Sequence, residues 1–155
     1  MPTANALTAI RRSSALLALL LTLAACAVRL APLYDQALVQ GITAANADTL
    51  ELLASASGGT QKTRFDEREP RYYNLIGRLD ALAIQAGTRP PPKASAADAA
   101  VPSQTALQAI ADSLRKMSDT DREQGLTEVE VQAFRGQILI YMDQALTYEA
   151  ALERY

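Results

Sequence analysis

The sequence predicts an all-α fold, an antiparallel four-helix bundle that follows a cleaved N-terminal segment. Three observations favour this fold class. Apolar residues recur every three or four positions in four stretches of the chain, which is the period of one helix face. Proline and glycine residues separate these stretches, and capping residues stand where helices should begin. The sequence shows neither the alternating pattern of a strand nor an internal repeat of fixed period.

The first 25 residues have the layout of a signal peptide. Arg11 and Arg12 provide a basic start, and an uncharged, leucine-rich stretch follows over residues 15–25. The whole apolar stretch is shorter than the roughly 20 residues that span the hydrocarbon core of a membrane, so it does not predict a permanent transmembrane helix. At its end the residues Leu-Ala-Ala-Cys, 23–26, resemble the lipobox of bacterial lipoproteins.

The lipobox resemblance implies that the mature chain begins at Cys26 and carries diacylglycerol and acyl chains on that residue. We expect no other cofactor. Residues 1–25 would then be the cleaved lipoprotein signal peptide, 26–32 the lipidated tether, and 33–155 a single helical-bundle domain. Ala27, in place of an aspartate, implies an outer-membrane location facing the periplasm, by analogy with enteric lipoproteins. The alternative is an ordinary secreted protein whose cleavage site precedes a free thiol.

Composition limits the chemistry available to the mature chain. Cleavage leaves 130 of the 155 residues, about the size of one domain. It removes two of 15 basic residues and none of 17 acidic ones, so the net charge changes from −2 to −4, and no basic surface for nucleic acid is expected. The chain has no histidine, which excludes the commonest catalytic and metal-binding arrangements. We therefore expect a protein that is not an enzyme.

Two helices are predicted in the first half of the domain. The first spans about 33–57, with Pro32 in its first turn and glycines at its end. Residues 37–47 carry no charge, which indicates burial in the bundle itself or contact with a partner. Residues 60–70 are predicted to form an irregular lead or a short helical turn, and the second helix spans about 71–86. The apolar faces of the two helices are Tyr34, Leu38, Ile42, Ala45, Thr49 and Leu52, then Tyr72, Leu75, Ile76, Leu79, Leu82, Ala83 and Ala86.

A proline-rich linker over 87–103 separates these helices from two more. The third helix is expected at about 104–117, capped by Ser103, with the face Leu107, Ile110, Leu114 and Met117. The fourth is expected at about 128–153, because Thr127 and Glu130 match a capping box. Its inner face carries Val131, Phe134, Ile138, Tyr141, Met142, Ala145, Tyr148 and Leu152.

The segment before the fourth helix has the spacing of an EF-hand calcium loop, and it is the one candidate metal site. Carboxylate or hydroxyl groups occupy loop positions 1, 3, 5, 9 and 12. Gln124 stands at position 6, where the sharp turn needs glycine, and capping of the fourth helix is a simpler role for the last two residues. The candidate ligands are Asp119, Asp121, Glu123, Thr127 and Glu130.

Together with the lipobox, the stretches YYNLIGRLDALAIQA and EQGLTEVEVQAFRGQILIYMDQALTYEAALERY resemble short helical proteobacterial lipoproteins without an assigned activity. This resemblance carries over no catalytic residue. We expect a lipid-anchored binding, scaffolding or envelope-assembly factor with an unidentified protein partner. The alternatives are a pilotin-like chaperone of a secretion component, which requires an exposed apolar groove, and a sensor of calcium or another small ligand.

Overall fold

Every regular element in residues 32–89 and 101–154, the part of the chain that our computed structural model describes, is a helix. The prediction of an all-α helical bundle is thereby confirmed. Cys26, the proposed signal peptide and most of the proposed linker lie outside the described residues. The elements are α2 (Gln36–Ser55), the 3₁₀ segment η1 (Lys62–Glu67), α3 (Glu69–Gly87), α4 (Pro102–Glu123) and α5 (Glu128–Leu152).

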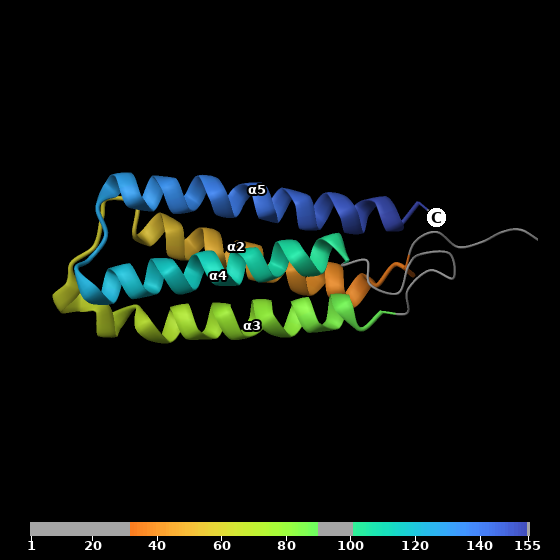
Figure 1. The fold of residues 1–155 in the computed structure, drawn as a ribbon, viewed down its shortest axis with the longest axis horizontal. Helices are drawn as coiled ribbons and strands as arrows, with labels where there is room; N and C mark the ends of the chain where they lie inside the picture. The colour runs from red at the N-terminus through yellow and green to blue at the C-terminus, as the bar shows by residue number, and fades with distance from the viewer. Residues whose placement is uncertain (1–31, 90–100, 155) are drawn as a thin grey trace, which may run out of the picture. The chain divides into compact units, whose positions relative to one another are not determined.

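Consecutive helices run in opposite directions, so the bundle has up-down-up-down order (Figure 1). Helices α2 and α4 each pack against both α3 and α5 and lie diagonally opposite each other. We call the end that holds residues 56–68 and 124–127 the loop end. The other end, where α2 and α4 begin and α3 and α5 finish, is the terminal end.

A single apolar core joins the four helices. The predicted face of the third helix is buried completely, and most of the faces predicted for the other helices are buried as well. Full burial of a large apolar side chain contributes about 1.5–3 kcal/mol, so packing of these faces is the main term that holds the bundle together. The largest fully buried apolar side chains are Tyr72, Leu38, Ile42, Leu52, Leu53, Leu79, Leu107, Ile110, Leu114, Met117 and Ile138.

The starts of α2 and α5 are set by side-chain caps. The capping box of α5 is present: Glu130 N–H donates to Thr127 Oγ1 at 3.2 Å, and Thr127 N–H donates to Glu130 Oε2 at 2.8 Å. Helix α2 starts three residues later than predicted, because Asp35 is its cap. Asp35 Oδ1 accepts from the backbone N–H groups of Ala37 and Leu38 at 2.9 and 3.1 Å. Each cap satisfies donors that the first helical turn leaves without partners.

Proline occupies the first turn of both α3 and α4, where its missing N–H costs nothing. The predicted cap of the third helix was wrong: α4 begins at Pro102, and the Ser103 hydroxyl accepts a hydrogen bond from Arg89 instead. The predicted end at Met117 was also wrong, since α4 continues to Glu123. Gly125, with φ +81°, follows that end, and its backbone conformation suits glycine best. The short helical turn expected within residues 60–70 is η1.

Candidate functional site

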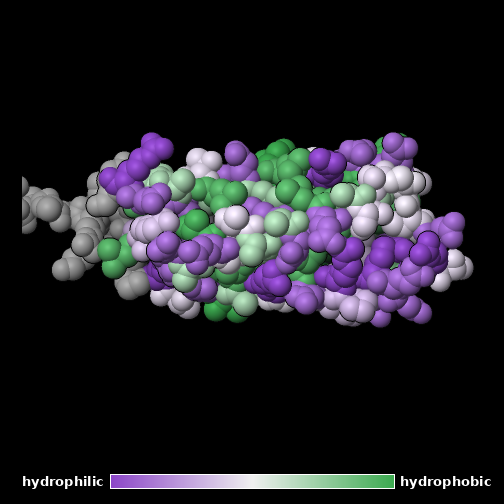
Figure 2. Space-filling model, turned by 180° about the vertical axis from the view of Figure 1, so that it is seen from behind, coloured by the Kyte–Doolittle hydropathy of each residue, from purple (hydrophilic) through white to green (hydrophobic). Residues whose placement is uncertain are grey.

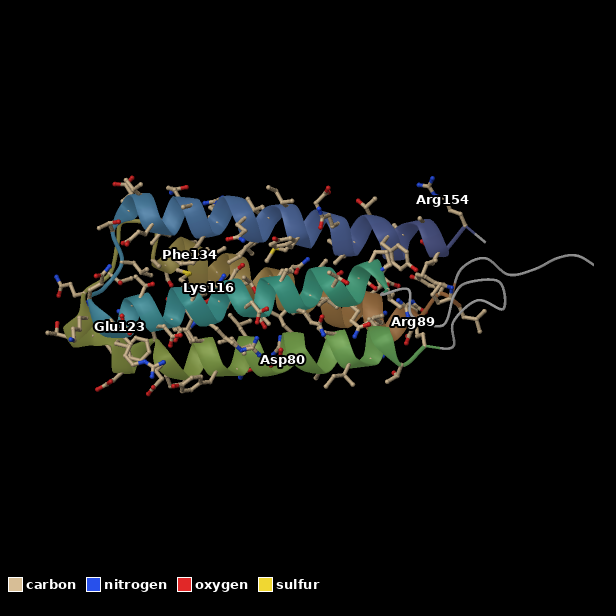
Figure 3. All side chains as sticks on the ribbon, in the orientation of Figure 1. Asp80, Arg89, Lys116, Glu123, Phe134 and Arg154 are labelled. Carbon is tan, nitrogen blue, oxygen red and sulfur yellow. The ribbon has the colours of Figure 1, made fainter. Side chains whose placement is uncertain are left out.

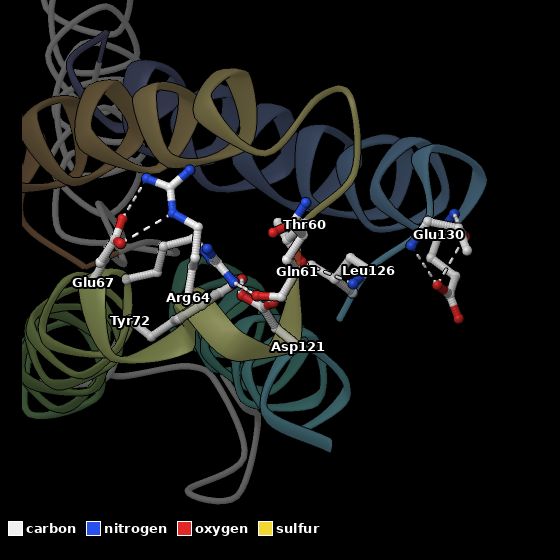
Figure 4. Close-up of polar contacts among 10 residues, drawn as sticks. Thr60, Gln61, Arg64, Glu67, Tyr72, Asp121, Leu126 and Glu130 are labelled. Atoms are coloured by element: carbon white, nitrogen blue, oxygen red, sulfur yellow. Dashed lines mark hydrogen bonds and ion pairs between the residues drawn. The ribbon is translucent and has the colours of Figure 1, made fainter. Parts of the chain in front are cut away.

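A buried carboxylate organises the loop end (Figure 4). Arg68 forms a bidentate ion pair with Asp121: its Nε donates to Oδ2 and its Nη2 to Oδ1, both at 2.7 Å. Thr60 Oγ1 donates to Oδ1 at 2.5 Å and Tyr72 Oη to Oδ2 at 3.2 Å. The Asp121 side chain has no exposed surface. These four residues form the loop-end cluster, in which α4 is bonded to the start of α3 and to the segment after α2.

The cluster also shifts the pKa of two of its members, Tyr72 and Arg68. Burial, followed by the negative charge of Asp121, raises the pKa of Tyr72 well above its usual range. The hydrogen bonds to Asp121 raise the pKa of Arg68. Tyr72 is therefore held as a neutral donor and Arg68 as a cation, and neither is available as a general base near neutral pH.

Two loops meet closely at the same end. Thr60 N–H donates to the Leu126 carbonyl at 2.7 Å, and Leu126 N–H donates to Thr60 Oγ1 at 2.8 Å. A Cβ at Gly125 would lie 2.7 Å from the Thr60 carbonyl oxygen, and one at Gly59 would lie 2.8 Å from that of Leu126. Both glycines have positive φ. Glycine is thus required at each of these two positions for two reasons: the backbone conformation and the close approach of the loops.

The five candidate calcium ligands do not converge in the structure. Asp121 lies in the core with Arg68, Asp119 pairs on the surface with Arg122 at 2.8 Å, and Glu123 is exposed in the last turn of α4. Thr127 and Glu130 cap α5. Within the described residues, no group of three or more histidine, cysteine or acidic side chains is arranged to hold a metal ion. The first three ligands were expected on a loop but belong to a helix, which points their side chains in different directions.

A buried guanidinium organises the terminal end, where Figure 3 labels Arg89. Its Nη1 and Nη2 donate to Glu149 Oε2 and Oε1 at 2.8 and 2.5 Å, and Nη2 also donates to Ser103 Oγ at 3.2 Å. Backbone carbonyls of Leu33 and Ala86 accept from the same group. The Glu149 side chain has no exposed surface, and that of Arg89 has 8%. We call this the terminal-end cluster; through one side chain it joins α3, α4, α5 and the segment before α2.

Sequence reasoning missed both clusters. Glu149 offered the clearest signal, because it stands in the apolar stripe of α5, four residues after Ala145 and three before Leu152. A carboxylate at such a position has to be paired. Its partner could not be read from the sequence, since Arg89 lies 60 residues away.

Three surface cavities lined by described residues have walls of mixed polar and apolar character. One of about 570 Å³ lies beside the start of α2, between Tyr34, Gln40 and Arg89. Another of about 380 Å³ lies at the loop end beside Arg64 and Arg71. These arginines already have carboxylate partners, Glu67 and Glu51. None of the three cavities combines an activated nucleophile with a base.

Apolar side chains gather on the surface where α2 and α5 lie together. Figure 2 shows hydrophobic groups along this side of the molecule. Leu50 of α2 is 39% exposed, and Leu139 and Ile140 of α5 are 39% and 59% exposed. We call the surface around these three residues the α2–α5 face. The uncharged stretch of α2 flanks it.

Helix geometry places both leucines on the flanks that face each other. Asp48 pairs with Arg78 of α3, and Leu50, two residues later, lies about 200° round α2, on the side of α5. In Figure 3 the labelled Phe134 lies on the edge of α5 that is turned toward α4, and Leu139, five residues later, lies about 140° round α5, on the side of α2. The two exposed leucines therefore belong to one continuous surface.

Of the helices in the described part of the chain, none combines the length and the apolar character needed to cross a membrane. Comparisons with family models, with curated proteins and with solved structures give no match. The α2–α5 face is therefore the candidate functional surface on structural grounds alone.

Proposed function

We propose that the chain is a lipid-anchored protein of the bacterial envelope that faces the periplasm and binds another protein through the α2–α5 face. The anchor is Cys26, within the lipobox-like residues 23–26. Two or more acyl chains would keep the domain at the membrane, because each buried methylene contributes about 0.8 kcal/mol.

The α2–α5 face carries the binding part of this proposal. Elsewhere the exposed large apolar side chains in the described helices lie apart: Tyr73 and Ile84 are 11 residues apart on α3, and Val129 lies in the first turn of α5, which does not pack against α3. On the α2–α5 face three such side chains lie together beside an uncharged helix surface. Clustered apolar exposure of this kind is typical of protein-binding surfaces.

Binding without catalysis fits the state of the buried ionisable groups. Asp121 and Glu149, the two carboxylates that are buried within residues 32–89 and 101–154, are both bidentate partners of arginine. Such pairs stabilise one arrangement of the helices and leave no free buried acid or base in the two clusters. A pilotin-like chaperone is less well supported, because it needs an apolar groove and none of the cavities described above has a predominantly apolar lining.

Two measurements test the proposal. The intact mass of the protein extracted from its native membrane should correspond to a chain that begins at Cys26 and carries acyl lipid, and Cys26→Ala should abolish the lipid-bearing species. A photo-crosslinking amino acid at Leu50 should give a protein adduct in that membrane. The same amino acid at Ile84, which is 65% exposed on the diagonally opposite side of the bundle, is the matched control. An unlipidated chain, or equal adducts at both positions, would overturn the proposal.

A further inference from the structure

We infer that the partner on the α2–α5 face is a second copy of this chain, related to the first by a two-fold axis that passes near Leu139. This inference rests on the proposed use of the face in protein binding and names the occupant. In a two-fold pair the same surface serves both copies, so the face must be complementary to itself.

The charges of the face have this property. Arg135 and Asp143 lie on the exposed side of α5, four residues before and four residues after Leu139. An antiparallel pairing of two α5 helices about Leu139 therefore places each Arg135 opposite the partner copy's Asp143. Neither side chain forms an ion pair with another residue in the described part of its own chain. Two intermolecular ion pairs therefore form, and no ion pair inside either bundle is lost.

A parallel pairing has the opposite electrostatics. It places Arg135 beside Arg135 and Asp143 beside Asp143, and like charges at close range disfavour association. The charge pattern therefore selects the antiparallel arrangement, in which Leu139 contacts its own copy at the centre and Ile140 lies next to it.

The flanking surface of α2 extends the contact. From Gln36 to Ala47 this helix has no charged residue. Its outer side can therefore be buried in an interface without leaving a charge unpaired. Two helices, each about 10 Å wide and packed over about 30 Å, give a footprint of roughly 600 Å². This approaches the ~800 Å² per partner of an ordinary specific interface. The uncharged run of α2, unexplained by the core alone, becomes part of the interface.

The test uses the full-length chain in its native membrane, with the photo-crosslinking amino acid at Leu50 and two differently tagged copies. We expect a covalent species of twice the chain mass that contains both tags, and no such species from position 84. Arg135→Asp or Asp143→Arg alone should lower its yield about tenfold, because each single change places like charges together. The double variant Arg135→Asp/Asp143→Arg should restore it.

The outcomes separate this inference from the proposed function. Adducts with a different protein and none with the second tag would overturn the self-association and leave the proposed function standing. Loss of yield that the double variant fails to restore would also overturn the inference. Both charged residues are on the surface, so the single variants should retain the helical circular dichroism spectrum of the wild type, which checks that the change in yield does not come from unfolding.

Discussion

At the loop end of the bundle a buried carboxylate gathers donors from several segments, whereas at the terminal end a buried guanidinium gathers acceptors. Asp121 accepts from Thr60, Arg68 and Tyr72, so three different side chains share its charge. Glu149 accepts side-chain hydrogen bonds in the described structure from Arg89 alone. Both ends are closed by one bidentate ion pair, but only the loop end has further donors that would remain after the arginine is lost.

The difference shows what a buried ion pair contributes at each end. Removing one partner of such a pair leaves the other charge buried without its counter-ion. The resulting loss of folding stability depends on which other groups donate hydrogen bonds to that charge. The loop end should therefore tolerate loss of its arginine better than the terminal end. The following variants test that ranking, from the largest expected effect to the smallest.

Arg89→Met should be the most destabilising change, by about 3–5 kcal/mol, because it leaves Glu149 buried without its donors. Chemical denaturation of the wild type and the variant measures the loss. Arg89→Met/Glu149→Leu should recover most of it, since the stranded charge is then absent. The matched control is Arg115→Met, whose ion pair with Asp80 is about 40% exposed and should contribute at most about 1 kcal/mol. Equal losses for both arginines would contradict the argument.

Arg68→Met should cost about 2–3 kcal/mol, less than Arg89→Met, because the hydroxyls of Thr60 and Tyr72 still donate to Asp121. The same denaturation experiment gives the ranking. Adding Tyr72→Phe should then bring the total close to the cost of Arg89→Met. If Arg68→Met alone were the more costly change, the idea that additional donors share the charge would be wrong.

Asn46→Leu should stabilise the protein by about 1–2 kcal/mol. Asn46 lies in α2 between the two ends, is 94% buried, and its Oδ1 and Nδ2 have no hydrogen-bond partner in the described structure. A buried amide without partners costs about 1–3 kcal/mol, and leucine has a similar size without that cost. The melting temperature should rise by several degrees. A fall would mean that water or a neighbouring group satisfies the amide.

Asp35→Asn should lower the stability of the protein least of these variants. The loss should be seen near neutral pH and should disappear in acid. The hydrogen bond that the Leu38 N–H donates to the Asp35 carboxylate is the main cause that lowers the pKa of Asp35 below its ordinary 3.8. As the pH falls, the Asp35 carboxylate is protonated at a higher pH in the unfolded chain than in the folded protein. The ionised carboxylate therefore makes its full contribution to folding stability above about pH 4. This contribution is lost as the pH falls through the folded-state pKa. The difference in melting temperature between wild type and variant should therefore shrink from pH 7 to pH 2.

The sequence was sufficient to predict the features that depend on near neighbours. The capping box of α5 and the buried face of α4 follow from residues three or four positions apart, and both are present. The prediction failed where a residue had two local roles. Asp119 and Asp121 were candidate ligands of a loop, beside the simpler interpretation of this segment as a capped turn. In the structure Asp119 pairs with Arg122 three residues later, and Asp121 lies in the core. A helix accommodates both arrangements, and so α4 continues past the predicted end.

The clusters themselves were beyond sequence reasoning for a physical reason. Arg68 and Asp121 are 53 residues apart, and Arg89 and Glu149 are 60 apart. Pairings at that distance are decided by which helices become neighbours, and four helices with a long linker admit more than one order. The α2–α5 face depends on the same choice, since Leu50 and Leu139 share a surface only because the first and last helices of the bundle are adjacent.

The contact of Arg89 with α3, α4, α5 and the segment before α2 has a consequence for the kinetics of folding. Its guanidinium can form its full set of bonds only when the segment before α2, the end of α3, the start of α4 and the end of α5 have assembled. Interactions that need every segment in place form after the transition state, so Arg89 should have a φ-value near zero. Arg89→Met would then accelerate unfolding and leave the folding rate almost unchanged, which makes this side chain a determinant of how long the folded bundle persists.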